Sequence, residues 1–341
     1  MDQTIEQRPL VSLCMATCSR ADLFPQSFAG LLNQTYSPLE VVVLVDGANP
    51  DSIRILELCG DARVRWLVTP RPSGMVAAWN RVCRDAKGKY LLFCADDDIL
   101  LPKAIDRQVD LLEKHPSVGF CHADFVFVDD DDRHIGAWIS HRGDFIDFGI
   151  NAWPQYVVGT GCCMQTTVVR RELWQKVGGW DDAGYPADNS LYLKLLRIAD
   201  VGHVRGVACR YRVRTRKPDS WEKRFRSLVE FHDLSVKHLQ NPPAFSPGRL
   251  KQIRRRLFSS LAIRAVALAV TAPGEKQEEA LRCWLTQHVW GGSTTGRISR
   301  AVDRINCLAA LYKILRGYCR FRRLIKSLVL YSRFRNRPAV S

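Results

Sequence analysis

Four apolar runs near the start of the chain each precede a stretch in which apolar residues recur every three or four positions. Runs without polar alternation are typical of strands that are buried on both faces of a parallel sheet, and the longer spacing predicts helices. The predicted strands cover residues 11–15, 39–45, 64–67 and 90–94, and the predicted helices cover residues 21–33, 50–58, 75–86 and 102–115. Repeated strand–helix units indicate an α/β fold with a mostly parallel sheet.

The pattern changes in the next part of the chain. Apolar residues run from 118 to 128 with no helical stretch between them, which indicates a mixed second half of the sheet. Four consecutive aspartates follow at 129–132 and predict the tip of a hairpin. We assign no chemistry to that run.

Charge divides the chain into two parts. Residues 241–341 hold 20 Lys and Arg against 4 acidic residues, whereas the first 240 residues hold 30 against 31. Prolines cluster at 241–248, as is typical of a linker. The sequence therefore predicts a near-neutral domain over 1–240 and a basic helical region over 241–341.

Targeting signals and the pattern of cysteines indicate the cellular compartment in which a protein works. The chain has no apolar stretch of about 20 residues, as a spanning helix needs, and its first residues lack the layout of a signal peptide. Its twelve cysteines include no CxxC pair, which favours reduced core thiols over disulfides or a zinc site. We therefore expect a cytoplasmic protein.

Polar loops follow three of the predicted strands, at residues 16–19, 46–48 and 96–98. Ligands bind beyond the carboxyl ends of the strands in an open α/β sheet, so these loops predict one shared site. The three aspartates of the last loop repel one another and require a cation, either a side chain or a metal ion. Mg²⁺ and Mn²⁺ take carboxylate oxygens and share their other positions with water and phosphates. The alternative is a solvated turn in which Asp98 caps the following helix.

Motifs along the first two thirds of the chain resemble, in order and spacing, those of the family 2 glycosyltransferases of the GT-A fold. The matching segments are VSLCMATCSR at 11–20, LEVVVLVDG at 39–47, AWNR at 78–81, AKGKY at 86–90, FCADDDI at 93–99, RREL at 170–173, VGGWD at 177–181, ADNSLYLKL at 187–195 and YRVR at 211–214. The resemblance implies a Rossmann-like GT-A catalytic domain over 1–240, with helices on both faces of the sheet.

The resemblance also implies roles in nucleotide binding. Asp46 would hydrogen-bond the base, and Ala16, Thr17 and Cys18 would line the base pocket. Asp96 would lie near the ribose and phosphates. Asn80 stands on an otherwise apolar helix, where we expect it to help hold the loop on the donor side.

Further residues would serve the transfer itself. Asp97 would ligate Mn²⁺ or Mg²⁺, with Asp98 assisting or capping the next helix. Arg214 would face the diphosphate. Asp188, at the start of a helix, would be the general base of an inverting transfer, and its simpler role as a helix N-cap is compatible with that function.

Four residues depart from the family pattern. Val45 and Ala95 stand where many members carry aspartates, so metal ligation rests more heavily on Asp97. Cys18 replaces a tyrosine. Arg214 replaces a histidine, and a permanent cation suits a position beside a diphosphate.

These features predict an enzyme that transfers a sugar from a nucleotide-diphosphate sugar, which we interpret as a UDP-sugar, to an acceptor hydroxyl with inversion. The expected acceptor is a glycan or a lipid-linked molecule of bacterial-type polysaccharide or glycoconjugate synthesis. The alternative is a non-catalytic module of the same fold that binds nucleotide sugars or membranes, which the changes at Val45 and Ala95 favour.

Basic and apolar residues alternate at helical spacing from Arg249 onward. Such helices could cap the catalytic domain and leave a solvated basic face, or they could contact anionic lipid at the inner face of the membrane. Both interpretations stay open. We expect no nucleic acid as a partner, because no recognition motif or aromatic stacking platform accompanies the charge.

Overall fold

The computed structural model describes residues 8–159, 162–182, 184, 187–216 and 218–284. The chain forms two compact units, of which the first runs to Lys217 without Val157–Gly159, and the second contains those three residues and the chain from Pro218 onward. The boundary predicted after residue 240 stays a prediction; that residue ends a helix inside the second unit.

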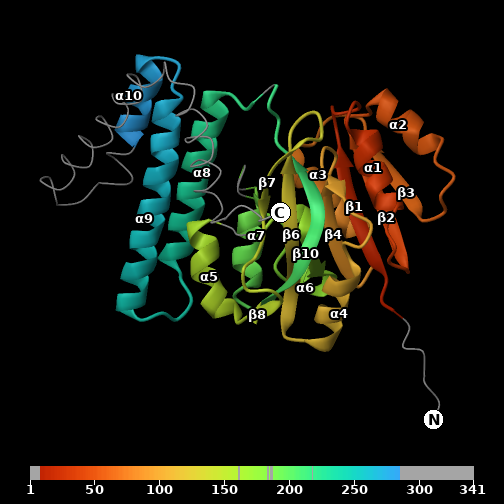
Figure 1. Cartoon of the computed structure of the whole chain (residues 1–341), viewed down its shortest axis with the longest axis horizontal. Helices are drawn as coiled ribbons and strands as arrows, with labels where there is room; N and C mark the ends of the chain where they lie inside the picture. Colours follow the sequence, from red (N-terminus) through yellow and green to blue (C-terminus); the bar gives the residue numbers. More distant parts are fainter. Residues whose placement is uncertain (1–7, 160–161, 183, 185–186, 217, 285–341) are drawn as a thin grey trace, which may run out of the picture. The chain divides into compact units, whose positions relative to one another are not determined.

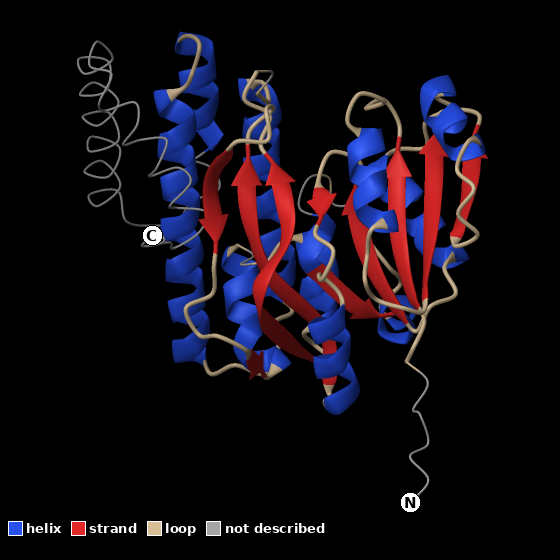
Figure 2. Cartoon of the chain, turned by 45° about the vertical axis from the view of Figure 1, so that its right-hand side comes forward, coloured by secondary structure: helices blue, strands red, loops and turns tan. Residues whose placement is uncertain are grey.

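One mixed sheet of ten strands runs through the described part of the first unit, in the order β3-β2-β1-β4-β9-β6-β10-β5, with β7 beside β6 and β8 beside β10. Figure 2 shows the strands in red. They are β1 (Val11–Thr17), β2 (Leu39–Asp46), β3 (Val64–Thr69), β4 (Tyr90–Ala95), β5 (Ile99–Leu100), β6 (Val118–Val128), β7 (His134–Trp138), β8 (Phe145–Asp147), β9 (Thr167–Arg170) and β10 (Asp200–Arg212).

The first four strands are parallel, as the sequence predicts. β1 lies between β2 and β4, and β3 joins the outer side of β2. Leu13 and Cys14 are neighbours on β1 and face opposite sides of the sheet, yet both are fully buried. Each predicted strand is confirmed and extends one or two residues further. Their carboxyl ends share one edge of the sheet, where the predicted loops lie.

Helices cover both faces of this sheet (Figure 1). Leu13 and Met15 share a core with α1 and α4, whereas α3 packs against β1 and β2 on the face of Cys14. The described helices of this part are α1 (Phe24–Leu32), α2 (Pro50–Glu57), α3 (Met75–Asp85), α4 (Asp106–Lys114), α5 (Gly149–Val158), α6 (Arg171–Lys176) and α7 (Ala187–Leu195), with a short 3₁₀ turn at Met164–Thr166.

The second half of the sheet is mixed, as predicted. β6 pairs in parallel with β10 and antiparallel with β7 and β9. Residues 129–133 turn between β6 and β7, and the Asp129 N–H donates to the carbonyl of Arg133 at 3.0 Å. The hairpin predicted for the four aspartates is therefore confirmed.

The helix predicted over 102–115 begins later, at Asp106. Strand β5 precedes it and pairs with β10, and the N–H of Leu101 donates to the carbonyl of Ala208 at 2.8 Å. Because residues 99–101 are bonded to β10, the helix does not begin directly after them. The N-cap residue is Ile105, so the interpretation of Asp98 as the cap of this helix is wrong.

The described part of the second unit contains α8 (Trp221–Gln240), α9 (Pro247–Val270) and α10 (Glu275–Trp284). α8 and α9 run antiparallel, since Trp221 Nε1 at the start of α8 donates to the carbonyl of Leu268 near the end of α9 at 3.0 Å. Ser220 and Ser246 cap the two helices through their hydroxyls. Within the residues described, no helix has the length and apolar character needed to cross a membrane.

Candidate functional site

Asp96, Asp97 and Asp98, named here the acidic loop, follow β4 and are largely buried. Thr17 Oγ1 donates to Asp96 Oδ2 at 2.8 Å. Arg20 Nη1 lies 3.0 Å from Asp96 Oδ1 and 2.6 Å from Asp97 Oδ2. The sequence predicts that either a basic side chain or a metal ion balances the charge of this loop, and in the structure the side chain of Arg20 does so.

Burial dominates the electrostatics of the acidic loop. Desolvation raises the pKa of Asp96 above its ordinary value, against the opposing effects of Arg20 and Thr17. Desolvation also raises the pKa of Asp98, and the charge of Asp97 adds to that shift. A cation bound beside these carboxylates would favour their charged forms and lower both pKa values.

Arg212, the last residue of β10, holds the acidic loop in place. Its backbone N–H donates to Asp98 Oδ1 at 2.7 Å, and its Nε donates to the carbonyl of Asp97 at 3.0 Å. The remaining nitrogens reach the carbonyl of Asp129 at 3.0 Å and Asp132 Oδ1 at 2.6 Å. Only 2% of this side chain is exposed, so the guanidinium is a fixed part of the fold.

Asp46 ends β2 and holds the segment that leads into α3. Its Oδ1 accepts hydrogen bonds from Thr69 Oγ1 at 2.7 Å and from Ser73 Oγ at 2.8 Å, and its Oδ2 accepts the N–H of Gly74 at 3.2 Å. Burial acts to raise the pKa of Asp46, but these hydrogen bonds outweigh it and the pKa is lowered. Asp46 is therefore a charged, positioned carboxylate at the edge of the sheet.

The end of β1 lies between Asp46 and the acidic loop. Ala16 pairs in register with residues of both β2 and β4. Cys18 is exposed, and the pKa of its thiol is raised by desolvation and then by the charges of Asp46 and Asp96. The predicted base-pocket residues and the acidic loop are thus brought together.

Asp188 lies in the first turn of α7. Its Oδ1 accepts the N–H of Asn189 at 2.9 Å, and burial raises its pKa. The buried thiol of Cys163 lies within electrostatic range of both Asp98 and Asp188, because after desolvation both charges raise its pKa. That Asp188 shares one site with the acidic loop stays a prediction.

Asn80 in α3 bonds to a neighbouring segment through both ends of its amide. Nδ2 donates to the carbonyl of Trp180 at 2.9 Å, and Oδ1 accepts the Trp180 N–H at 3.0 Å. Gly179 beside it has φ of 69°, and a Cβ there would lie 2.4 Å from Asn80 Oδ1. Asn80 thus holds the segment that precedes α7, and its expected role on the donor side stays a prediction.

Arg214 lies just beyond β10, with Nε 3.2 Å from Asp130 Oδ1 and 34% of its side chain exposed. Asp130 Oδ2 also accepts the backbone N–H groups of Thr215 and Arg216, each at 2.6 Å. The aspartates at 129–132 are named here the acidic turn. Through Asp130 this turn binds the segment that carries Arg214 and fixes its position. We assigned them no chemistry from the sequence, and their contacts give them a positioning role.

Arg20 and Arg212 are two functional residues to which the sequence motifs gave no role. Arg20 stands inside the motif at 11–20, directly after the loop that we assigned to the base pocket. Arg212 precedes Arg214 by two positions on the same basic segment. Both residues are positively charged, whereas the runs at 96–98 and 129–132 are acidic. This complementary charge is the sequence feature that could have indicated them.

The described residues contain no group of three or more His, Cys, Asp or Glu side chains arranged to hold a metal ion by themselves. Asp97 nevertheless fits one ligand position, because its carboxylate is a hard oxygen donor with 12% of its side chain exposed. Mg²⁺ commonly takes one or two protein carboxylates and completes its shell with substrate phosphates and water. The donor set therefore fits an ion that binds together with a diphosphate.

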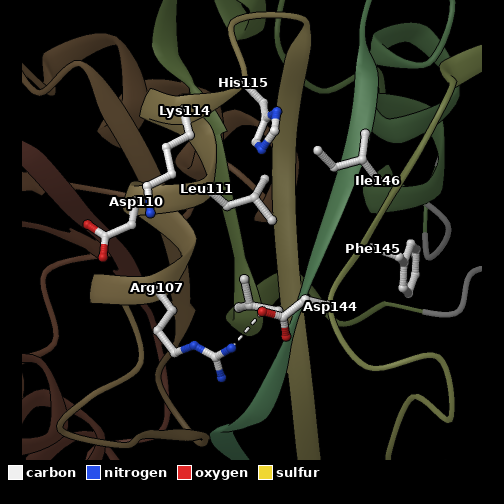
Figure 3. A pocket seen from close by; sticks show the side chains of 9 residues that line it. Arg107, Asp110, Leu111, Lys114, His115, Asp144, Phe145 and Ile146 are labelled. Carbon is white, nitrogen blue, oxygen red and sulfur yellow. Dashed lines mark hydrogen bonds and ion pairs between the residues drawn. The ribbon is translucent and has the colours of Figure 1, made fainter.

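A separate hollow of about 500 Å³ lies beside α4 (Figure 3). Arg107 and Asp144 line it and form an ion pair at 2.6 Å. Leu111 and Ile146 supply apolar surface. The hollow contains none of the predicted site residues, so it is distinct from the candidate site.

Comparison with known families confirms the resemblance. The Glycosyl transferase family 2 model matches residues 12–177, and across this stretch the chain is similar to that family. The chondroitin synthase of Escherichia coli is 25% identical over 208 residues, which cover 59% of this chain and 28% of that protein. An uncharacterized glycosyltransferase of Rickettsia prowazekii is 24% identical over 233 residues, covering 66% of this chain and 70% of that protein. The chain spans about a quarter to a half of the length of the first curated relatives it matches.

Solved glycosyltransferase structures share the fold. S. aureus TarS 1-349 in complex with UDP superimposes with a TM-score of 0.58 at 14% identity, over 82% of this chain and 88% of that one. The mannosyltransferase PcManGT from Pyrobaculum calidifontis, in complex with GDP-Man and Mn²⁺, gives 0.57 at 18% identity, over 97% and 89%. The GT-A fold expected from the sequence is therefore confirmed.

Proposed function

We propose that the chain is a glycosyltransferase that moves a sugar from a nucleotide-diphosphate sugar to an acceptor hydroxyl with inversion. The observation that carries the proposal is that Asp46 and the acidic loop lie on either side of the end of β1, at the carboxyl edge of one sheet. We place Asp188 at the same site. Ligands of open α/β sheets bind at this edge. The match to glycosyl transferase family 2 supports the reaction class.

The nucleotide would bind between β1 and β2. Asp46 would accept a hydrogen bond from the base, Ala16, Thr17 and Cys18 would line the pocket, and Asp96 would face the ribose and phosphates. Asn80 would support the donor side through the segment it holds. A UDP-sugar is the donor we favour, and the UDP complex of TarS supports this choice, although PcManGT was solved with GDP-Man.

Mn²⁺ or Mg²⁺ would be held by Asp97, with Asp98 assisting. When bound, such an ion would neutralise charge that grows on the departing diphosphate. Arg214 would provide a second cation for the same charge, and its partly exposed side chain leaves it reachable. The Mn²⁺ complex of PcManGT supports the choice of metal.

Asp188 would be the general base. Inverting transfer requires a group that takes the proton of the acceptor hydroxyl as it attacks the anomeric carbon. Burial raises the pKa of Asp188, and a base is most effective when its pKa approaches the working pH.

The acceptor would be a glycan or a lipid-linked molecule of polysaccharide or glycoconjugate synthesis, reached at the inner face of a membrane. Helix α9 supports a membrane contact, because its sequence holds six Lys and Arg and no acidic residue. Phe258 and Ile263 on this helix are exposed by 43% and 50%. Each Lys or Arg close to an anionic lipid surface contributes about 1 kcal/mol of binding. In this proposal, residues 1–240 catalyse and residues 241–341 contribute the membrane contact.

Turnover of the donor tests the proposal. Purified protein is incubated with a panel of UDP-, GDP- and dTDP-sugars, and release of the nucleoside diphosphate is measured with Mn²⁺ and with EDTA. We expect release from one nucleotide class and its loss with EDTA. A protein that binds a nucleotide sugar in a thermal-shift experiment but never turns it over would be the non-catalytic module instead.

A further inference from the structure

Two arginines bond to the acidic loop, and the fold holds them in different ways. Arg212 is 2% exposed and bonds to several groups of the loop and of the acidic turn. Arg20 is 42% exposed, and its Nη1 alone contacts both Asp96 and Asp97. Arg212 is therefore a fixed cation, whereas the guanidinium of Arg20 is accessible to solvent.

The backbone of Arg20 is anchored independently of its guanidinium. Its carbonyl accepts the N–H groups of Leu23 at 3.0 Å and Phe24 at 2.9 Å, where α1 begins. Rotation about the side-chain torsions would therefore release the aspartates without moving the main chain. Such rotamer changes are fast for exposed side chains.

Asp96 and Asp97 differ in the side-chain contacts that they keep when the guanidinium of Arg20 moves away. Asp96 keeps the hydroxyl of Thr17 on its Oδ2. Asp97 Oδ2 has the guanidinium at 2.6 Å, and its main chain is already held by Arg212. A divalent cation placed on this oxygen would repel the guanidinium across a very short distance. Cation binding at Asp97 and the pair with Arg20 therefore oppose each other.

We propose that Arg20 is a built-in counter-ion of Asp97 that makes metal binding depend on the donor. This inference rests on the proposed function. A divalent ion alone must displace the guanidinium from Asp97. A donor diphosphate offers the displaced guanidinium a new anionic partner, since arginine pairs strongly with phosphate oxygens. Metal and donor then favour each other's binding, and Arg20 contributes part of that coupling.

Mn²⁺ binding in the absence of donor tests this role directly. The full chain is titrated with Mn²⁺, and free Mn²⁺ is followed by electron paramagnetic resonance. We expect Arg20→Gln to bind Mn²⁺ about tenfold more tightly than the wild type, because the competing cation is gone. Arg20→Lys keeps the charge and should stay close to the wild type.

The matched control is Arg216→Gln, which removes the same charge from a residue that pairs with Asp131 in the acidic turn. It should leave Mn²⁺ affinity unchanged, so that a gain in Arg20→Gln alone identifies the pair with Asp97. Adding UDP or GDP should tighten Mn²⁺ binding less in Arg20→Gln than in the wild type. Equal or weaker Mn²⁺ binding by Arg20→Gln, or an equal gain in Arg216→Gln, would overturn the proposal.

Donor turnover by the same wild-type preparation separates this inference from the proposed function. If the wild type turns over a donor and Arg20→Gln binds Mn²⁺ no more tightly, the counter-ion role of Arg20 fails alone. If no protein binds Mn²⁺ and no donor is turned over, both proposals fail. Circular dichroism of each variant confirms that the comparison is made between folded proteins.

Discussion

Asp98 Oδ1 accepts the backbone N–H of Arg212 at 2.7 Å, a bond between residues 114 positions apart in the sequence. It ties the loop after β4 to the end of β10, so the acidic loop and the segment that carries Arg214 share one rim of the sheet. Because this bond occupies one oxygen of Asp98, Asp97 is the aspartate that we assign first to a metal ion.

Replacing Arg212 with alanine should destabilise the protein and the site together. The change removes the guanidinium that bonds to the carbonyls of Asp97 and Asp129 and to the carboxylate of Asp132, and each buried acceptor left without a donor costs about 1–3 kcal/mol of unfolding free energy. Urea unfolding measures the loss. The control is Arg210→Ala on the exposed side of the same strand, for which we expect a change within about 0.5 kcal/mol. Similar losses in both variants would contradict the role given to Arg212.

Replacing Asp46 with asparagine should weaken nucleotide binding and lower stability at neutral pH by about 2 kcal/mol. Because the folded pKa of Asp46 is lowered, its contribution is present above the ordinary carboxyl pKa of about 4 and is lost as the pH falls through the folded value. Urea unfolding of the wild type and Asp46→Asn should therefore differ at pH 7 and converge toward pH 3. Asp51→Asn, at an exposed position in α2, is the control. A difference that stays constant with pH would count against the charged hydrogen bonds of Asp46.

Replacing Asp188 with asparagine should raise stability while transfer is lost. A carboxyl whose pKa is raised on folding holds its proton more tightly in the native state, so its ionisation costs stability above the ordinary carboxyl pKa. We expect a gain on the order of 1 kcal/mol at pH 7 that shrinks toward pH 3. Urea unfolding at both pH values measures it. Lower stability of Asp188→Asn at pH 7 would show that the charge of this carboxylate is well solvated or paired.

The basic face of α9 should bind anionic vesicles. Each Lys or Arg near such a surface contributes about 1 kcal/mol, so the change of Arg254, Arg255 and Arg256 to glutamine should weaken co-sedimentation more than tenfold. Phe258→Ser should weaken it as well. Leu58→Ser is the matched control, because Leu58 is another exposed hydrophobic residue, at 76%, directly after α2. Equal binding to neutral phosphatidylcholine vesicles, or no effect of these changes, would exclude the proposed contact.

The parallel half of the fold was predictable because each strand is a continuous apolar run. Val41 and Val42 are both fully buried although they point to opposite faces, so no polar residue interrupts the pattern. The start of α4 was not predictable in the same way. It depends on the N–H of Leu101 bonding to Ala208, a contact that local spacing does not reveal.

The candidate site was likewise predictable only in part. Asp46 and the acidic loop follow buried strands, so their position at the edge of the sheet could be inferred from the sequence. Their partners could not. Arg212 reaches the acidic loop because β10 pairs with β5, the strand that directly follows that loop, and pairing between strands distant in the sequence leaves no spacing that the sequence reveals.

The most direct test of the account compares binding and turnover in Asp188→Asn. Donor affinity is measured by calorimetry with Mn²⁺, and transfer is measured as release of nucleoside diphosphate in the presence of an acceptor. We predict that donor affinity stays within about threefold of the wild type while turnover falls by at least 10²-fold, since a general base contributes about 10²–10⁴-fold. Wild-type turnover by Asp188→Asn would contradict the account.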